Sequence, residues 1–314
     1  MPQNNGATLS RYAAYQLADV NKTRPQYGAL TPRWLTALLE FKGLESGIYR
    51  VNRVVEGETP LDILCSQQAP HATIPSGFTP YETKPKEYEL NAISTIINVD
   101  TRVSDVYSSP YDQTAEQLAL AIESLRERQE SQIINSSDYG LLANAIETQR
   151  VKPRFGAPMP DDMDELLAKV WKEPSFFLAH PRAIAAFERE CTRRGVPPST
   201  ARIHGGTFIE WRGVPLIPTD KLLVDGLRNP VSAKGKTNIL LVRTGENKRG
   251  VVGLYQTGMP GEQSRGLSVR LRGVDEKGVA SYLLSLYCSV AILADDAVAV
   301  LEDVEIGDYY DYSR

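Results

Sequence analysis

The stretch from residue 109 to residue 135, SPYDQTAEQLALAIESLRERQESQIIN, predicts one long amphipathic helix. Ser109 can cap free backbone N–H groups, Pro110 suits the first turn, and Asp112 places negative charge at the positive end of the helix dipole. Apolar side chains recur along one stripe, at Ala115, Leu118, Ile122, Leu125 and Ile133. Such a helix spans roughly 40 Å, so we expect it to lie on a surface formed by other parts of the chain.

The rest of this helix is densely charged, with Glu123, Glu127 and Glu130 interleaved with Arg126 and Arg128. Paired carboxylates can serve as a general acid and base. Arginines between them instead favour a salt-bridged or solvated face. We therefore interpret the charged face as structural and not as an active site.

Length and composition set wide limits on the fold and the partners. A chain of 314 residues exceeds one ordinary core, so two subdomains or one elaborated domain are expected. Its 42% hydrophobic and 24% charged residues are typical of a globular protein, and a net charge of -4 gives no general case for nucleic-acid binding. We find no run of about 18 apolar residues and therefore expect no membrane span. Residues 1–9 lack the pattern of a signal peptide.

Ahead of the helix, the sequence predicts an arm and then a hairpin. Residues 12–20 have a weak helical pattern, and Thr31 and Pro32 start a short helix that Gly43 ends. Alternating residues predict strands at 47–55 and 86–103, which we expect to pair over 86–99 as a long projecting hairpin. Because an isolated hairpin is only marginally stable in water, this one is expected to pair with another subunit.

After the helix, residues 150–160 have the composition of a linker, and the remainder is of α/β type. Helices are expected over 161–171 and after His180, and Arg212 and Gly213 are expected to form a tight hairpin turn. Strands are predicted at 175–179, 207–211, 214–218, 239–243, 250–256, 266–272, 282–293 and 297–304.

Charge is unevenly distributed along the chain. Residues 1–53 hold seven basic and three acidic side chains, whereas residues 295–314 hold seven acidic side chains and one basic side chain, Arg314. Solvated faces are the simpler explanation. The alternative is that a basic arm meets an acidic tail, within one subunit or between subunits.

No convincing catalytic group emerges from the sequence. Cys191 lies three helical turns from His180, which is too far for a Cys–His couple. The three cysteines and three histidines are scattered without metal-ligand spacing, which favours reduced thiols and a cytoplasmic location. We find no phosphate-binding loop, no dinucleotide fingerprint and no nucleophile elbow.

An arm, a hairpin, a long helix and an α/β half, in that order, resemble the major capsid proteins of tailed phages, with the Hong Kong 97-like fold. The segment FFLAHP at 176–181 and the run RGVPLIPTD at 212–220 also resemble the axial domains of those capsids. More narrowly, NKTRPQ at 21–26, LTPRWL at 30–35 and GIYRVNR at 47–53 resemble encapsulin shell proteins of family 2, subclass A, which lack an inserted nucleotide-binding domain.

The resemblance implies an α+β capsid fold and the following division of the chain. Residues 1–46 would form the N-terminal arm, 47–99 the extended loop hairpin, and 100–154 the peripheral domain with its spine helix at 109–135. Residues 155–249 would form the axial domain, and 250–314 would return strands to both domains and end in the acidic tail.

The family further implies a shell subunit that is not an enzyme and has no cofactor. Sixty copies would close into an icosahedral nanocompartment around a cysteine desulfurase, in sulfur metabolism or storage, with pyridoxal phosphate belonging to that cargo. We expect assembly-arm contacts from Lys22, Arg24, Arg33, Trp34, Tyr49, Arg50 and Arg53. Pore loops are expected at 195–206 and 226–236, with Arg202, His204, Arg228, Lys234 and Lys236.

Three alternatives remain open at this point. A phage or prophage capsid protein would share the fold but package DNA. A cryptic enzyme could use Cys191 and His204, and a non-assembling α/β binding protein would be a monomer.

Overall fold

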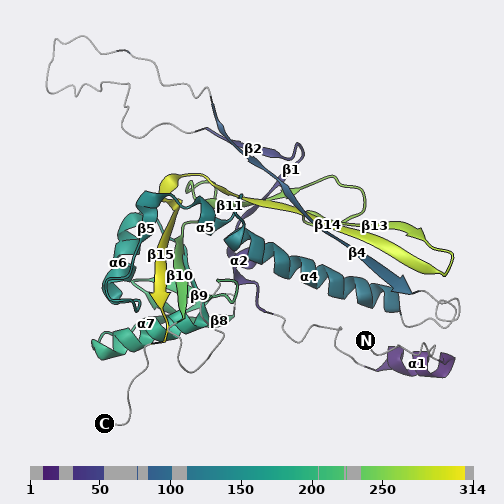
Figure 1. The fold of residues 1–314 in the computed structure, drawn as a ribbon, viewed down its shortest axis with the longest axis horizontal. Coiled ribbons are helices and arrows are strands. Elements are labelled where there is room, and N and C mark those ends of the chain that lie inside the picture. The colour runs from purple at the N-terminus through teal and green to yellow at the C-terminus, as the bar shows by residue number, and fades with distance from the viewer. Residues whose placement is uncertain are drawn as a thin grey trace.

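A computed structural model describes residues 10–20, 31–52, 76, 84–100, 112–203, 205–222, 224 and 235–307. Two sheets lie at opposite ends of an elongated subunit, with helix α4 (Gln113–Asn135) running along the first (Figure 1). Within the described residues, no helix is long and apolar enough to cross a membrane.

The first sheet is built around the long strand β14. Its strand order is β1-β11-β14-β13-β12, and β4 pairs with β14 in addition. Only β1 and β11 run parallel. The strands are β1 (Phe41–Leu44), β4 (Asn91–Asp100), β11 (Val251–Gln256), β12 (Glu262–Ser264), β13 (Leu267–Val274) and β14 (Val279–Ile292).

Helix α4 covers one face of this sheet, as its apolar stripe predicts. Ala121 and Leu125 pack against Leu284 and Leu286 of β14, with Leu118 and Ile122 beside them. The predicted start at Ser109 is wrong, because Asp112 is the N-cap and accepts a hydrogen bond from the Ala115 backbone N–H. Ala115 is exposed and does not belong to the packed stripe.

The second sheet has seven strands in the order β5-β15-β10-β6-β9-β8-β7. Helices α6 (Pro160–Lys169) and α7 (Pro181–Arg193) pack on one face. The other face packs against α2 (Trp34–Leu38), the end of α4 and α5 (Leu141–Asn144). The strands are β5 (Arg150–Val151), β6 (Phe176–Ala179), β7 (Ser199–Ile203), β8 (Gly206–Trp211), β9 (Val214–Pro218), β10 (Lys236–Val242) and β15 (Val298–Glu305).

Several local predictions for this half are confirmed. His180 caps α7 and accepts a hydrogen bond from the Arg182 backbone N–H. Arg212 and Gly213 have φ angles of 53° and 82°, as a two-residue hairpin turn between β8 and β9 requires. Residues 150–160 do not form a linker throughout, because Arg150 and Val151 form β5, which pairs parallel with β15.

Within the described residues, the predicted hairpin is shorter than expected. β2 (Ile48–Val51) pairs antiparallel with β3 (Lys86–Glu89) only, as a separate two-stranded sheet. The following strand, β4, leaves β2 and pairs with β14 along its whole length. Pairing over 86–99 is therefore wrong beyond Glu89, and residues 53–75 and 77–83 lie outside the described part of the chain. Strands β11 to β14 join the first sheet and β15 the second, so the returning strands are divided between both.

The arm also differs in detail from its prediction. Helix α1 (Arg11–Asp19) forms where residues 12–20 indicated it. Helix α2 begins at Trp34 with Arg33 as its N-cap residue, so neither Thr31 nor Pro32 has the predicted role. Gly43 does not end a helix but lies in β1, where a Cβ would come within 2.6 Å of the Thr257 side chain. The remaining short elements are η1 (Glu147–Gln149) and η2 (Asp295–Ala297).

Candidate assembly site

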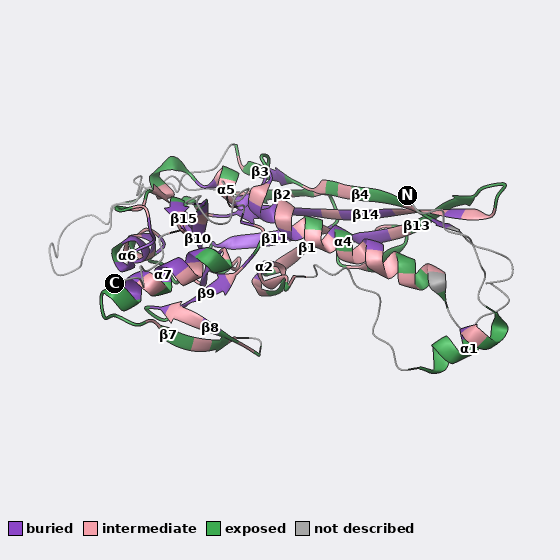
Figure 2. Ribbon diagram, turned by 60° about the horizontal axis from the view of Figure 1, so that its bottom comes forward, coloured by how far each residue is buried: buried purple, intermediate pink, exposed green. Residues whose placement is uncertain are grey.

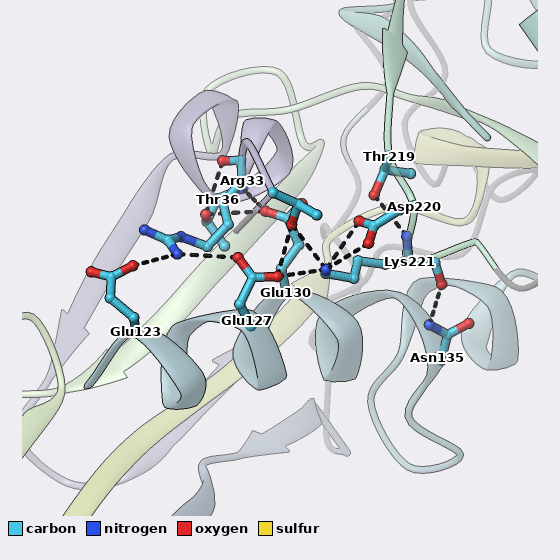
Figure 3. Close-up of polar contacts among 10 residues, drawn as sticks. Arg33, Thr36, Glu123, Glu127, Glu130, Asn135, Thr219, Asp220 and Lys221 are labelled. Carbon is cyan, nitrogen blue, oxygen red and sulfur yellow. Dashed lines mark hydrogen bonds and ion pairs between the residues drawn. The ribbon is translucent and has the colours of Figure 1, made fainter. Parts of the chain in front are cut away.

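The charged face of α4 meets the arm and the second sheet at one place, which we call the arm cluster (Figure 3). Three glutamates on successive turns of α4 point toward the segment that leads into α2. A lysine from the turn after β9 approaches from the other side. The arm cluster consists of Thr31, Arg33, Thr36, Glu123, Glu127, Glu130 and Lys221.

Arg33 joins the arm to two turns of α4. Its Nη1 lies 2.7 Å from Glu123 Oε2 and 3.2 Å from Glu127 Oε1. All three side chains are half-buried, so water screens the pairs less than at an open surface. This contact fixes Arg33 on its own subunit.

Glu130 is the most buried member, with 1% of its surface exposed. Its Oε2 accepts hydrogen bonds of 3.1 Å from both the backbone N–H and the hydroxyl of Thr36. Burial raises the pKa of Glu130 above its ordinary value, and the Thr36 hydrogen bonds only partly offset this. The first turn of α2 is thereby bonded directly to α4.

Lys221 completes the arm cluster from the second sheet. Its Nζ lies 2.5 Å from Glu127 Oε2 and donates to Thr31 Oγ1 at 3.0 Å. Burial opposes ionisation of Glu127, but hydrogen bonds from Lys221, Thr31 and Arg33 outweigh it and hold its pKa below the ordinary value. Asn135, the last residue of α4, donates to the Lys221 carbonyl at 2.8 Å. Each α4 carboxylate here is engaged, so this face fastens segments together and offers no free base.

A second charged contact holds β1 and β2 near the turn after β10. Lys42 Nζ lies 2.5 Å from Glu246 Oε1, to which the Tyr49 hydroxyl donates at 2.8 Å. Burial and the Glu246 carboxylate raise the pKa of Tyr49 to about 12. The Lys42 and Tyr49 hydrogen bonds hold the pKa of Glu246 below its usual value.

The other arm candidates have separate positions. Trp34 packs edge-on against Phe208, with ring centroids 5.2 Å apart, and belongs to the core between α2 and the second sheet. Arg50 pairs across strands with Glu87, at 2.7 Å. Lys22, Arg24 and Arg53 lie outside the described residues. Roles between subunits stay predictions for all of them, while Arg33, Trp34, Tyr49 and Arg50 contact their own subunit.

Two acidic residues near the C-terminus, Asp296 and Glu302, have partners outside the basic arm. Asp296 pairs with Arg243 at 2.5 Å and with Lys172 at 3.1 Å, and Glu302 pairs with Arg150. Among the described residues, the arm's cations pair instead with α4, Glu87 and Glu246. Asp296 and Glu302 thus pair outside the arm, while contact between arm and tail stays a prediction because residues 308–314 lie outside the described part of the chain.

The pore candidates are not assembled into one feature of the subunit. Arg202 is exposed in β7, and Lys236 is the exposed first residue of β10. Much of the expected 195–206 loop is therefore strand, paired with β8. Arg228, Lys234 and His204 lie outside the described residues, and the pore roles stay predictions.

The thiols described by the structure lack the features of nucleophiles. Burial raises the pKa of Cys191 to about 11 and that of Cys288 to about 12. The proximity of Cys191 to His204 stays untested because His204 is not described. Among the described residues, no three His, Cys, Asp or Glu side chains are placed to hold a metal ion.

Sequence patterns identified the glutamates of the arm cluster but not what binds them. Thr31 resembled a helix cap, and Lys221 resembled an ordinary turn residue. They meet across a separation of 190 residues, and no local periodicity can indicate such a contact. The interleaved charges on this helix indicate a salt-bridged or solvated face, without saying which.

Comparisons with known proteins agree over nearly the whole chain. The sequence model described as SrpI-like, type 2A encapsulin shell protein, matches residues 49–308. The type 2A encapsulin shell protein SrpI of Synechococcus elongatus is 55% identical over 304 residues, covering 97% of this chain and 96% of the relative.

Solved structures give the same result for the fold. The cryo-EM structure of the holo-SrpI encapsulin complex from Synechococcus elongatus PCC 7942 has a TM-score of 0.81 at 53% identity, covering 98% of this chain and 99% of that one. The capsid of an empty GTA particle has a TM-score of 0.61 at 13% identity, over 94% of this chain and 99% of that one. At this identity the match supports a shared fold and nothing further. The predicted phage-capsid fold is confirmed.

Proposed function

Because this chain belongs to the SrpI-like family of type 2A encapsulin shell proteins, we propose that sixty copies close into an icosahedral shell around a cysteine desulfurase. It is a shell protein that forms a nanocompartment. The proposal adds the number of copies, the cargo, a role in sulfur metabolism or storage, and a cytoplasmic location. Pyridoxal phosphate would belong to the cargo and not to the shell.

The observation that carries the shell proposal is the end-to-end match to the SrpI chain of an encapsulin complex, over 98% of one chain and 99% of the other. A match of this extent includes the arm, the first sheet and the second sheet together. The arm and both sheets of this chain therefore all have counterparts in a chain of that complex.

One edge of the first sheet supports this proposal, because the described residues place no strand along part of it. β4 pairs with β14 on one side. On the other side, the pairing with the β2 segment stops at Leu90, whose backbone N–H donates to the Gly47 carbonyl. Beyond this point the described residues place no strand along the other edge of β4. An open edge of this length is a template for pairing with another chain, and one role of a second subunit would be to cover it.

The cargo proposal rests on the family resemblance carried by residues 21–26, 30–35 and 47–53. The chemistry of the shell is compatible with it. Cys191 and Cys288 are buried thiols with raised pKa values, so neither is activated as a sulfur acceptor. Sulfur transfer would then be left to the enclosed enzyme.

Particles isolated from the native cells test both parts of the proposal. Negative-stain microscopy is expected to show uniform closed spheres. Mass spectrometry of their contents is expected to identify a cysteine desulfurase, and the absorbance spectrum of the particles is expected to show pyridoxal phosphate. Spheres that contain DNA would support the phage-capsid alternative. A monomer at all salt concentrations and pH values would contradict the shell.

Truncation tests the arm, provided that the cut respects the core. Deleting residues 1–46 would remove Leu35 and Leu39, which are buried in the core of the second sheet. Deleting residues 1–30 spares them. We expect this shorter deletion to prevent particle formation while leaving a folded subunit by circular dichroism, and normal particles would contradict an assembly role for the arm.

A further inference from the structure

An open pocket of about 670 Å³ lies between the arm, α4 and the first sheet. Phe41 of β1, Tyr255 of β11 and Leu286 of β14 contribute apolar surface to it. Arg126 of α4, Ser264 of β12 and Arg265, which follows β12, contribute the polar part. An apolar floor with two arginines beside it suits a segment that combines acidic and aromatic side chains.

The two arginines differ from Arg33, which also lines the pocket. Arg33 is neutralised by Glu123 and Glu127. Among the described residues, no carboxylate lies within ion-pair distance of Arg126 or Arg265, and Arg126 has only a long hydrogen bond of 3.4 Å to the Ser264 hydroxyl. The pocket therefore carries positive charge that the described part of the subunit does not neutralise.

We propose that this pocket binds the acidic, tyrosine-rich segment 308–312 of a second copy of the chain. The segment reads DYYDY, with two carboxylates, three aromatic rings and no basic residue. A carboxylate can accept paired hydrogen bonds from a guanidinium group. A tyrosine ring can stack on the same arginine or lie on the apolar floor. This inference rests on the proposed assembly of many copies.

A second copy is the appropriate source because of where β15 ends. Ile306, near the last described residue, packs in the cluster beneath α6 and α7. The pocket walls formed by α2 and α4 lie on the side of the opposite cluster (Figure 1). The chain's own tail thus leaves from the face of the second sheet that is turned away from the pocket.

Peptide binding tests the pocket directly. A fluorescent peptide of residues 304–314 is added to protein that lacks residues 308–314, and binding is followed by anisotropy. We expect Arg126→Glu with Arg265→Glu to weaken binding by about a hundredfold, roughly tenfold for each charge-assisted pair, and binding should weaken as salt rises. Arg272→Glu, an exposed residue of β13, is the matched control and should change nothing.

Two further variants keep the test decisive. If the double reversal does not fold, Arg126→Gln with Arg265→Gln is used, and a peptide with Asp308→Asn and Asp311→Asn removes the charge from the other partner. Equal affinity for all proteins and both peptides would overturn the proposal.

Mixing separates a second copy from the chain's own tail. Subunits without residues 308–314 keep the pocket, and the Arg126→Glu, Arg265→Glu variant keeps the tail. If tails bind neighbours, particles assembled from the mixture should be more resistant to dissociation than particles of either variant alone. No gain on mixing, together with intact peptide binding, would overturn the assignment to a second copy. A wild-type chain that forms no particles would contradict the proposed shell, while the peptide measurement would still decide whether the pocket binds the segment.

Discussion

The two sheets of this subunit are completed in different ways. The second sheet is covered on both faces, and β6 is buried at all four positions. The first sheet is covered by α4 on one face. Its other face is packed by β2 and β3 near β1 and β11, and farther along β14 it carries polar pairs such as Ser94 with Ser285 and Ser281 with Asn98. The hairpin of β13 and β14 ends in an exposed tip (Figure 2). Both sheets thus have packed cores, but within the described residues the first sheet also has an exposed tip and an edge along which no strand lies.

Phe177→Ala in β6 is the strongest way to test this difference. Phe177 is fully buried between the second sheet and α6–α7, so its truncation should cost about 3–5 kcal/mol in the free energy of unfolding. Urea unfolding of unassembled subunits measures the loss. The matched truncation Leu271→Ala, at a residue of β13 that is 57% exposed, should change the free energy of unfolding by less than about 0.5 kcal/mol. Equal losses would show that the exposed tip is part of the subunit's own core.

Glu130→Ala tests how the arm is fixed between the two sheets. The variant leaves the Thr36 N–H without its acceptor, at a cost of about 1–3 kcal/mol. Exchange of the Thr36 amide hydrogen should accelerate about tenfold or more, as measured by hydrogen–deuterium exchange. Glu130→Gln, which keeps an oxygen acceptor, should lose less. Unchanged exchange in both variants would mean that α2 is held by its other contacts, such as the Arg33 ion pairs and the packing of Trp34 and Leu35, and not by Glu130.

Acidification should affect the arm cluster in two steps of opposite sign. The folded-state pKa of Glu130 is raised above its unfolded value, so the ionised Glu130 carboxylate destabilises the folded arm at neutral pH. As pH falls through the folded-state pKa, Glu130 takes up a proton, this destabilisation is lost and the arm becomes more stable. The folded-state pKa of Glu127 is lowered, so its stabilising contribution is present above its unfolded pKa and is lost as pH falls through the folded pKa. Arm protection measured against pH should therefore pass through a maximum in mildly acidic solution. Glu130→Gln should abolish the rise and keep the fall.

How much of this could be predicted depends mainly on the range of the contacts, although some local predictions, the helix starts at Ser109 and Thr31 and the helix end at Gly43, were also wrong. The packed stripe of α4, the Arg212–Gly213 turn and the cap of α7 follow from neighbouring residues, and the structure contains them. β4 illustrates the limit. Its alternation predicted a strand correctly, but nothing local shows that it pairs with β14, almost 200 residues away, and not with β2.

The arm cluster has the same limit. Glu123, Glu127 and Glu130 could be recognised as a salt-bridged or solvated face. Thr31 and Lys221 could not be recognised as its partners, because their contact depends on how the arm and the second sheet are placed on α4. Family resemblance supplied the capsid fold, but it did not supply these pairs.

Arg50→Ala should have the smallest effect on the subunit and offers the finest test of the comparison. Arg50 is paired with Glu87 at 2.7 Å, but the two side chains are 67% and 44% exposed. A surface pair of this kind contributes about 0–1 kcal/mol, so unfolding of isolated subunits should hardly change. If Arg50 also contacts a neighbour, as the arm prediction holds, the same variant should lower the resistance of assembled particles to dissociation by salt or denaturant.

Glu87→Ala removes the same intrasubunit pair without removing the arginine and is the control. A matching loss in both variants would assign the effect to the β2–β3 pair, whereas a loss confined to Arg50→Ala would place Arg50 at a contact between subunits.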